Sequence, residues 1–545
     1  MKKKRIFSAL LAACMTVAAA VGSSSSDAGA SASGSEGSAS GETSTPENFN
    51  AEGYPVVNEP IELSAFTFCE SDSGDFNTMT MVQEINEKTG VHVTFEQVMG
   101  DAYTERKNLL LASGTDLLGI FFGGGVTDSD ILRYGRAGVF IPLNDLIDKY
   151  APRVKQMMED DPSMQTLMPM EDGNIYDLPF DDQYLPENIP EMLFINKTWL
   201  ETLGLEMPTT TEEFRQVLTA FKENDPNGNS EADEIPFTYY PNATYEGDLS
   251  LSGSFGVLDT SKHIMIKDGT ALFSNTQDGY KDYIKYQAQL YAEGLLDPEV
   301  FTQDSSQYYA KNQGEVATVG VFSAYAPELF CGIDRANNEY TLLEPLEGPN
   351  GDRLWNKYNF GFYSGKILIT SDNEYPEATM RWADEFYDEE MSIRVHWGEI
   401  GDGVIKNDDG TYQLQNDLPD GYSIDSYRFL KAPAFYGPGV LLDSTYQKIT
   451  LGDDKIKKAQ YYEIYDPYTT TEYLPTVRLP EDDQEIVAQY FTDIDTYVEN
   501  NKAKWIVGEG DVDAEWENYK SDLDKMNVAE YVAVYQRAYD NSKAE

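Results

Sequence analysis

Three apolar runs near the start of the chain decide its fold class: IELSAFTFC (61–69), VHVTFEQV (91–98) and LLGIFF (117–122). Each run has the length and the β-branched and aromatic content of a strand. Between the first two, Met81, Val82 and Ile85 share one face of a helix that stops at Gly90, and residues 103–112 predict a second helix. Strand, helix, strand, helix, strand is the order of a parallel sheet covered on both faces, so we expect an α/β protein.

In such sheets, ligands bind beyond the carboxyl ends of the strands. Here these ends lead into the loops 69–77 and 122–128. The second loop contains Gly123-Gly124-Gly125, but it has neither the GxGxxG spacing nor the Walker lysine of a nucleotide-binding loop. The glycine run is therefore no nucleotide fingerprint.

Composition excludes several classes of function. The 545 residues include 94 Asp and Glu against 40 Lys and Arg, a formal net charge of -54. This charge would repel nucleic acid and anionic membrane surfaces. Three His and three Cys are too few and too scattered for a His/Cys zinc site or a redox pair. Lys406 and Arg428 form no basic cluster, so we assign them no role. At roughly 100 to 200 residues per domain, we expect two or three lobes.

The N-terminus predicts export. Four basic residues at 2–5 precede an apolar run from Ile6 to Val21, which is the order of a secretory signal peptide spanning residues 1–22. Leu11-Ala12-Ala13-Cys14 also matches a bacterial lipobox, so anchoring at the cell surface and free secretion both stay open. Residues 23–53 are rich in Ser and Gly and predict a flexible tether. Whether Cys69 and Cys331 pair is also open.

An acidic loop follows a well-capped helix. Thr210 and Glu213 have the spacing of a capping box before a helical apolar face. The helix leads into oxygen-bearing side chains spaced as in a Ca²⁺-binding loop, with Ser230 and Pro236 replacing the usual Gly and Glu. A capped surface turn is the alternative interpretation. We predict a structural Ca²⁺ site made by Asp225, Asn227, Asn229, Glu231, Asp233 and Glu234.

Several segments resemble one known family. They are GNIYDLP (173–179), FINKTWLETLGL (194–205), PTTTEEF (208–214), the acidic loop at 225–236, YPEA (375–378) and WGEIG (397–401). In this order they resemble the bacterial extracellular solute-binding proteins of ABC transporters, in particular the large carbohydrate-binding lipoproteins. The stretch from 194 to 236 is specific, whereas the C-terminal part matches less clearly.

The resemblance implies a periplasmic-binding-protein-like α/β fold, with two lobes joined by two or three crossing segments and a ligand cleft between them. The first lobe would contain 54–175 and about 360–405, and the second 176–359 and about 406–545. Its function would be to capture an oligosaccharide and deliver it, by cleft closure, to ABC permease subunits. The maltose-binding type of cleft implies sugar contacts from Glu70, Asp72, Asp75 and Phe122, with Asp181 and Asp182 at the lobe junction.

The chemistry of a sugar adds further candidates. A neutral oligosaccharide needs flat aromatic rings for its C–H faces and fixed carboxylates or amides for its hydroxyls. Aromatic residues in loop-like surroundings, together with a carboxylate of the WGEIG segment, give Tyr325, Trp355, Tyr358, Trp397 and Glu399. Ordinary packing is the alternative role for each aromatic ring, and a solvated surface for each carboxylate.

Three other functions stay open. A secreted glycoside hydrolase would use two carboxylates across a cleft, but with 94 acidic residues such pairs discriminate nothing. A transport receptor for peptides or metals and a surface adhesin are the others. The order of the family segments and the tether favour a monomeric, non-catalytic sugar receptor.

Overall fold

The three apolar runs form parallel strands. In the computed structural model, which describes residues 47–543 except 71–72, 242 and 420–421, β1 (Ile61–Cys69) lies between β2 (Val91–Met99) and β3 (Ile120–Phe122) and is parallel to both. The intervening helices are α1 (Thr80–Thr89) and α2 (Gly100–Ser113). Gly90 ends α1 with a left-handed φ of 76°. The predicted strand and helix order is confirmed.

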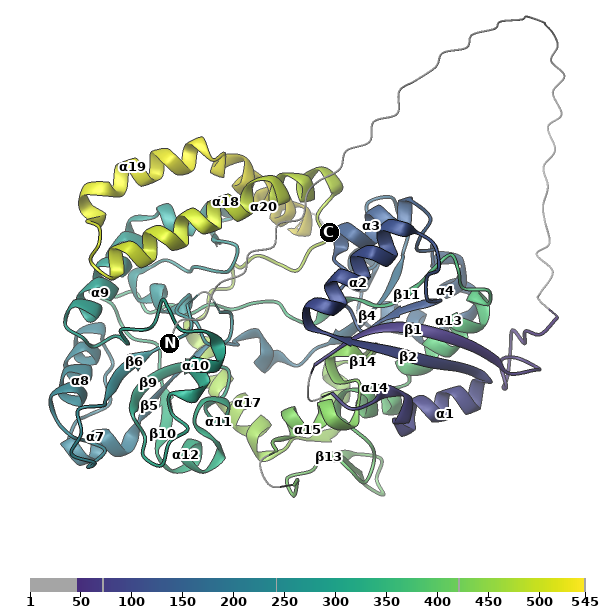
Figure 1. The fold of residues 1–545 in the computed structure, drawn as a ribbon, viewed down its shortest axis with the longest axis horizontal. Helices are drawn as coiled ribbons and strands as arrows, with labels where there is room; N and C mark the ends of the chain where they lie inside the picture. Colours follow the sequence, from purple (N-terminus) through teal and green to yellow (C-terminus); the bar gives the residue numbers. More distant parts are fainter. Residues whose placement is uncertain (1–46, 71–72, 242, 420–421, 544–545) are drawn as a thin grey trace, which may run out of the picture. The chain divides into compact units, whose positions relative to one another are not determined.

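Strands from distant parts of the chain complete the first sheet. They are β4 (Asp177–Asp182), β11 (Phe362–Ile369) and β14 (Gly439–Leu441), which give the order β14-β4-β11-β3-β1-β2. β11 is antiparallel to both β3 and β4. Successive residues of β1 enter different cores: Ala65 packs with α4 (Asn144–Tyr150), α5 (Pro152–Asp160) and α13 (Pro376–Asp384), and Phe66 with α2 and α3 (Asp128–Arg136). Helices therefore cover both faces (Figure 1).

A second sheet forms a separate lobe. Its strands are β5 (Met192–Asn196), β6 (Ile235–Thr238), β9 (Val319–Ala324) and β10 (Tyr340–Leu343), in the order β10-β5-β9-β6. Its helices include α7 (Lys197–Leu203), α8 (Thr211–Glu223), α9 (Asp278–Ala292) and α17 (Asp453–Tyr465). α8 has the predicted capping box of Thr210 and Glu213.

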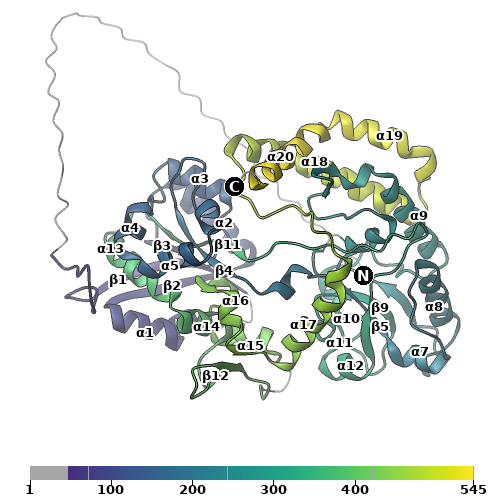
Figure 2. The same cartoon turned by 180° about the vertical axis from the view of Figure 1, so that it is seen from behind.

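The C-terminal helices belong to this second lobe. They are α18 (Glu481–Ile506), α19 (Val512–Lys525) and α20 (Val528–Lys543). They pack on α9 and on β8 (Thr270–Phe273), which pairs with β7 (Ile264–Lys267) (Figure 2). Among the described residues, no helix is both long and apolar enough to span a bilayer.

Three segments connect the two sheets. The chain leaves the first sheet after β4, returns at β11, and leaves again between β14 and α17. This confirms the predicted α/β fold with two lobes and a multi-segment connection.

The lobe boundaries differ from the prediction at three places. Residues 177–182 were expected in the second lobe, yet they form β4 of the first sheet. Residues from 406 to about 450 were expected in the second lobe, yet β14 pairs with β4 of the first sheet. The small sheet of β12 (Val404–Lys406), β13 (Tyr412–Leu414) and β15 (Ile449–Thr450) shares a core with Phe180 and Trp397. At the other end, residues 47–53 of the predicted tether belong to the folded part, where Phe49 is buried against Tyr150. The predicted signal peptide and the predicted tether up to residue 46 lie outside the described residues.

Both described cysteines are buried and free, which answers the open question of their pairing. Cys69 ends β1 in the first lobe, whereas Cys331 ends α11 (Pro327–Cys331) in the second.

A buried ion pair holds the segment before α18 to the first lobe. Arg478 donates to both carboxylate oxygens of Asp177, at 2.9 and 2.8 Å, and to the carbonyl of Met168 at 3.1 Å. The Asp177 side chain is 1% exposed and that of Arg478 6%. Asp128 lies 3.7 Å from the same guanidinium.

We predict that Arg478→Ala lowers the free energy of unfolding by about 3–5 kcal/mol, because it leaves the buried Asp177 carboxylate without its cation. Urea unfolding followed by fluorescence measures the loss. Lys149→Ala is the matched control, since its partner Asp145 is exposed and such pairs contribute about 0–1 kcal/mol. If both variants lost the same free energy of unfolding, the stabilising role of the ion pair between Arg478 and Asp177 would be contradicted.

Candidate functional site

The predicted loop 122–128 lines a pocket at the carboxyl ends of β1 and β3, whereas the loop 69–77 reaches only its margin, at Glu70. Its volume is about 580 Å³. Aromatic rings and one amine line this pocket. We call it the first-lobe pocket and define it by Phe68, Tyr103, Tyr363, Lys366, Phe435 and Tyr436. Glu70 stands at its margin, 3.5 Å from the hydroxyl of Tyr436. This is where an open α/β sheet places its ligand.

The glycine run shapes this pocket. Gly123, Gly124 and Gly125 all have positive φ, between 79° and 92°, which other residues adopt only with strain. A Cβ on Gly125 would lie 2.7 Å from the ring of Tyr103. The close approach lets the Tyr103 hydroxyl donate to the carbonyl of Gly124 at 2.8 Å. The glycines thus allow an aromatic ring to lie against the loop.

A second group of side chains lies where the crossing segments meet. We define this junction cluster by Tyr184, Glu187, Tyr325, Trp397, Arg428 and Lys455. The Tyr325 hydroxyl donates to Glu187 at 2.7 Å, and Lys455 lies 3.3 Å from the same hydroxyl. Arg428 lies over the ring of Trp397 at 4.6 Å. The cluster therefore joins a strand end of the second sheet to segments packed on the first.

The two groups are continuous. Arg428 also lies over Phe435 of the first-lobe pocket, 4.3 Å from its centroid. Phe435 in turn packs against Tyr363 at 5.8 Å. Lys455, 5.3 Å from the ring centroid of Trp397 and 5.5 Å from that of Tyr325, extends this series to the second lobe.

Burial changes the protonation of groups beside this cluster. Burial raises the pKa of Asp182 to about 6, although the Tyr446 hydroxyl, 2.7 Å away, opposes the shift. Burial and then Asp161 raise the pKa of Asp181 to about 8. Desolvation lowers the pKa of Lys458 to about 7. Burial, followed by Arg428, holds the pKa of His396 well below its usual value, so the imidazole is neutral and its Nε2 accepts from Arg428 at 2.6 Å.

Five of the predicted contacts lie at or near these groups. Glu70 borders the first-lobe pocket, and Tyr325 and Trp397 belong to the junction cluster, with Trp397 buried beneath Arg428. Asp181 and Asp182 end β4 beside the cluster, and both line a separate cavity of about 250 Å³.

The other predicted contacts have structural surroundings. Phe122 is fully buried against Phe95 and Trp382, so its expected role in the cleft is wrong, because its side chain points into the core. Trp355 is buried and donates to the carbonyl of Glu191 at 2.8 Å. Asp75 caps the short helix at 76–78, and Glu399 pairs with Arg394 at 2.7 Å. Tyr358 stacks on Phe360, and both line a pocket separate from the first-lobe pocket. Asp72 lies outside the described residues.

Sequence reasoning missed several members of both groups. Arg428 was given no role, yet it bridges Trp397, Phe435 and His396. Tyr363, Phe435 and Lys455 were also missed. Their signal was available only in part: Phe435 and Tyr436 stand beside Pro433 and Gly437, in loop-like surroundings of the kind that singled out other aromatics.

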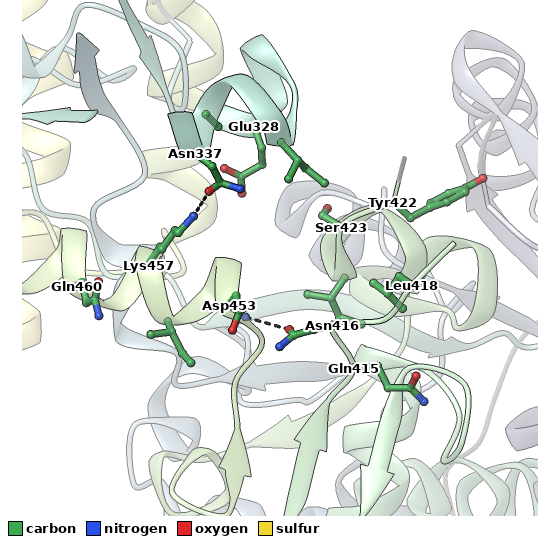
Figure 3. Close-up of a pocket in the computed structure, with 14 residues that line it drawn as sticks. Glu328, Asn337, Gln415, Asn416, Leu418, Tyr422, Ser423, Asp453, Lys457 and Gln460 are labelled. Carbon is green, nitrogen blue, oxygen red and sulfur yellow. Dashed lines mark hydrogen bonds between the residues drawn. The ribbon is translucent and has the colours of Figure 1, made fainter. Parts of the chain in front are cut away.

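Another pocket, of about 460 Å³, is lined by polar and aliphatic side chains from α12 (Ile333–Asn338), α17 and residues 415, 416, 418 and 422–424 (Figure 3). Asn416 accepts from the backbone of Asp453 at 3.0 Å, and Lys457 donates to Asn337. Tyr422 is the single aromatic residue among its lining side chains. Such a wall offers few faces for a sugar ring, so the first-lobe pocket and the junction cluster form the better candidate site.

The acidic loop brings its predicted oxygens together. Asp233 accepts from the side-chain amides of Asn227 and Asn229, each at 3.1 Å, and Asp225 accepts from the backbone of Ser230 at 2.9 Å. Burial, then Asp233 and Asp225, raise the pKa of Glu234, and its Oε1 has no hydrogen-bond partner among the described residues. The side chain of Glu231 is exposed. Three carboxylates so close together favour a cation.

Known proteins match this chain over most of its length. Residues 77–391 match the bacterial extracellular solute-binding protein family. The fructooligosaccharide ABC transporter substrate-binding protein FusA of Streptococcus pneumoniae is 34% identical over 484 residues, 86% of this chain and 88% of that protein. The structure of FusA in complex with kestose has a TM-score of 0.81 at 32% identity and covers 89% of this chain and all of that one.

Two further solved structures bear on the site and the fold. An EF-hand mutant of FusA in complex with fructo-nystose has the same TM-score, 0.81, identity, 32%, and coverage of both chains. A solute-binding protein from Bifidobacterium longum infantis, at 24% identity and a TM-score of 0.78, covers 89% of this chain and 99% of that one and supports the fold alone. By its matched residues and its identity to FusA, this chain belongs to the bacterial extracellular solute-binding protein family.

Proposed function

We propose that this protein is a non-catalytic receptor that captures an oligosaccharide and delivers it to an ABC importer. The observation that carries the proposal is a continuous series of aromatic rings and fixed polar groups. It runs from Tyr363 and Phe435 through Arg428, Trp397 and Lys455 to Tyr325. Rings of this kind pack on sugar C–H faces, and the carboxylates beside them bind hydroxyls. Because FusA is named for fructooligosaccharides, these are the first ligands to test.

Capture would work by stabilising a closed state. A sugar that contacts the first-lobe pocket and Tyr325 together gains contacts from both lobes, and these contacts are complete only when the lobes approach. Two carboxylates would be available to the hydroxyls of the sugar. Glu187 accepts a hydrogen bond from Tyr325, and Asp182 accepts one from Tyr446. A micromolar dissociation constant corresponds to about -8 kcal/mol. The closed form would then dock on permease subunits, with the receptor acting as a monomer.

We predict that kestose or a related fructooligosaccharide raises the melting temperature, whereas peptides do not. Tyr363→Ala should raise the Kd about 5- to 30-fold, because it removes about 1–2 kcal/mol of ring contact. Tyr422→Ala, in the other pocket, is the matched control and should leave the Kd unchanged. Calorimetry with each variant measures both.

The reverse pattern, with Tyr422→Ala defective and Tyr363→Ala intact, would move the site to the pocket of Figure 3. Stabilisation by a peptide alone would favour a peptide receptor. Release of reducing ends from the bound sugar would favour a glycoside hydrolase.

The acidic loop at 225–234 would hold a structural Ca²⁺. Asp225, Asn227, Asn229, Asp233 and Glu234 would supply side-chain oxygens, and Glu231 its backbone carbonyl, which is the usual donor at the seventh position of such a loop. The buried Glu234 Oε1, which has no hydrogen-bond partner among the described residues, supports a cation here. The ion would tie the end of α8 to the start of β6.

Chelation should lower the melting temperature of the wild-type protein, and Ca²⁺ should restore it, since an ion at a thousandfold excess over its Kd contributes about 4 kcal/mol. Asp233→Ala should abolish this response, because it removes a carboxylate at the centre of the loop. Asp304→Ala, at the N-cap of another helix, provides a control that keeps the response. A wild-type melting temperature that ignores Ca²⁺ would leave the loop as a capped turn.

Export fits the family, which acts outside the cell membrane by its description. Cleavage after Gly22 would release the chain, whereas lipidation of Cys14 would anchor it. Mass spectrometry of the mature N-terminus distinguishes the two.

A further inference from the structure

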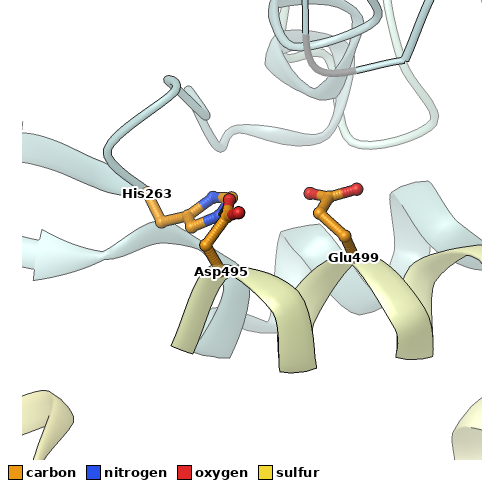
Figure 4. Close-up of side chains that lie close together, drawn as sticks. All are labelled: His263, Asp495 and Glu499. Atoms are coloured by element: carbon orange, nitrogen blue, oxygen red, sulfur yellow. Dashed lines mark hydrogen bonds and ion pairs between the residues drawn. The ribbon is translucent and has the colours of Figure 1, made fainter. Parts of the chain in front are cut away.

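A histidine and two carboxylates, those of Asp495 and Glu499, lie close together in the second lobe, away from the site described above (Figure 4). A third carboxylate, that of Asp259, lies beside the same histidine. His263 precedes β7, and Asp495 and Glu499 stand one turn apart on α18. The Nε2 atom of His263 lies 3.2 Å from Asp495, and Nδ1 lies 3.2 Å from Asp259. One ligand atom each from His263, Asp495 and Glu499 lie within 4.8 Å of one another.

The imidazole is held in a fixed orientation. Asp259 accepts from Asn275 at 2.9 Å and from Ser274 at 2.5 Å, so its carboxylate cannot rotate away from Nδ1. The backbone of His263 has a φ of 56° and is hydrogen-bonded at both its N–H, to Thr260, and its carbonyl, from Ser274. Proteins commonly orient a metal-binding histidine in this way. One ring nitrogen is hydrogen-bonded to a carboxylate, and the other ring nitrogen is left to bind the metal.

The local charge favours a cation. Asp259, Asp495 and Glu499 are three carboxylates around one imidazole. Lys502 lies 3.8 Å from Glu499, but its closer partner is Asp248, at 2.8 Å. Tyr519, buried at 2% exposure, interacts electrostatically with Asp259 and Glu499, and its hydroxyl has no hydrogen-bond partner among the described residues. The Asp495 side chain is 40% exposed, which gives an ion a path from solvent.

We propose that His263 Nε2, Asp495 and Glu499 bind a divalent transition-metal ion, with Zn²⁺ the best match, and that Asp259 is a positioning residue. Imidazole nitrogen with carboxylates suits Zn²⁺ or Co²⁺, whereas Ca²⁺ prefers oxygens alone. Ligand atoms around tetrahedral Zn²⁺ lie about 3.3 Å apart, so small rotations of Asp495 and Glu499 would close the group. The acidic loop at 225–234 is a separate site with another preference.

Binding would release a proton. A histidine nitrogen binds a metal only without its proton, so the metal would replace the proton on Nε2, and affinity should increase as pH rises. The bound ion would join the turn before β7 to α18, in place of the hydrogen bond between His263 and Asp495.

The test is titration of chelator-treated protein with Co²⁺ in the presence of excess Ca²⁺, which occupies the acidic loop. We expect visible absorption bands, their loss on adding Zn²⁺, and affinity that rises between pH 6 and 8. His263→Gln and Asp495→Asn should each weaken Co²⁺ binding at least tenfold, and Asp259→Asn about 10- to 100-fold with a changed pH profile. Asp493→Asn, exposed on the same helix, is the matched control.

Circular dichroism checks that each variant folds. If His263→Gln unfolds, the Co²⁺ affinity of Asp495→Asn tests the proposal instead. The Asp495 side chain is partly exposed, and asparagine has nearly the same shape as aspartate. Absence of Co²⁺ bands in the wild type, or equal affinity in wild type and Asp495→Asn, would overturn the proposal and leave the group as an ion-pair network. Sugar binding is a separate measurement and does not affect this result.

Discussion

The central position of β11 in the first sheet is the constraint on which the rest of the structure depends. This strand lies between β3 and β4 and hydrogen-bonds antiparallel to both, yet it follows the whole second sheet in sequence. A strand in that position buries Ile367, Leu368 and Ile369 completely. Because the first sheet is incomplete until the chain returns, the two lobes must be joined by several crossings rather than by one linker.

That topology also creates the site. Tyr363 lies on β11 itself, Phe435 and Arg428 belong to the segment that leads to β14, and Lys455 follows the last crossing. Each reaches the same region because its segment enters or leaves the first sheet there. The aromatic rings and the cations that hold them are therefore consequences of where the chain crosses, and a change of lobe separation would alter their mutual contacts directly.

The large negative charge is spread unevenly. Many carboxylates are exposed, but inside the fold the acidic groups have specific partners: Arg478 for Asp177, Lys502 for Asp248, and Tyr446 for Asp182. Buried carboxylates without such partners are costly. Several carboxylates gather in the acidic loop and in the group around His263, and these are the two places where we propose a metal ion.

The sequence by itself determined the α/β class, the first three strands, the capping box of α8 and the acidic loop, because each depends on residues close together in the chain. It also placed the loop 122–128 at the edge of the sheet where the first-lobe pocket lies, since the carboxyl ends of parallel strands meet there. It could not assign Phe122, whose strand is buried on both faces. Nor could it assign Arg428, whose partners include Phe435, 7 positions away, and His396, 32 positions away. Only the tertiary structure decided which aromatic rings line a cavity and which fill a core, because burial depends on contacts between segments that the chain order does not specify.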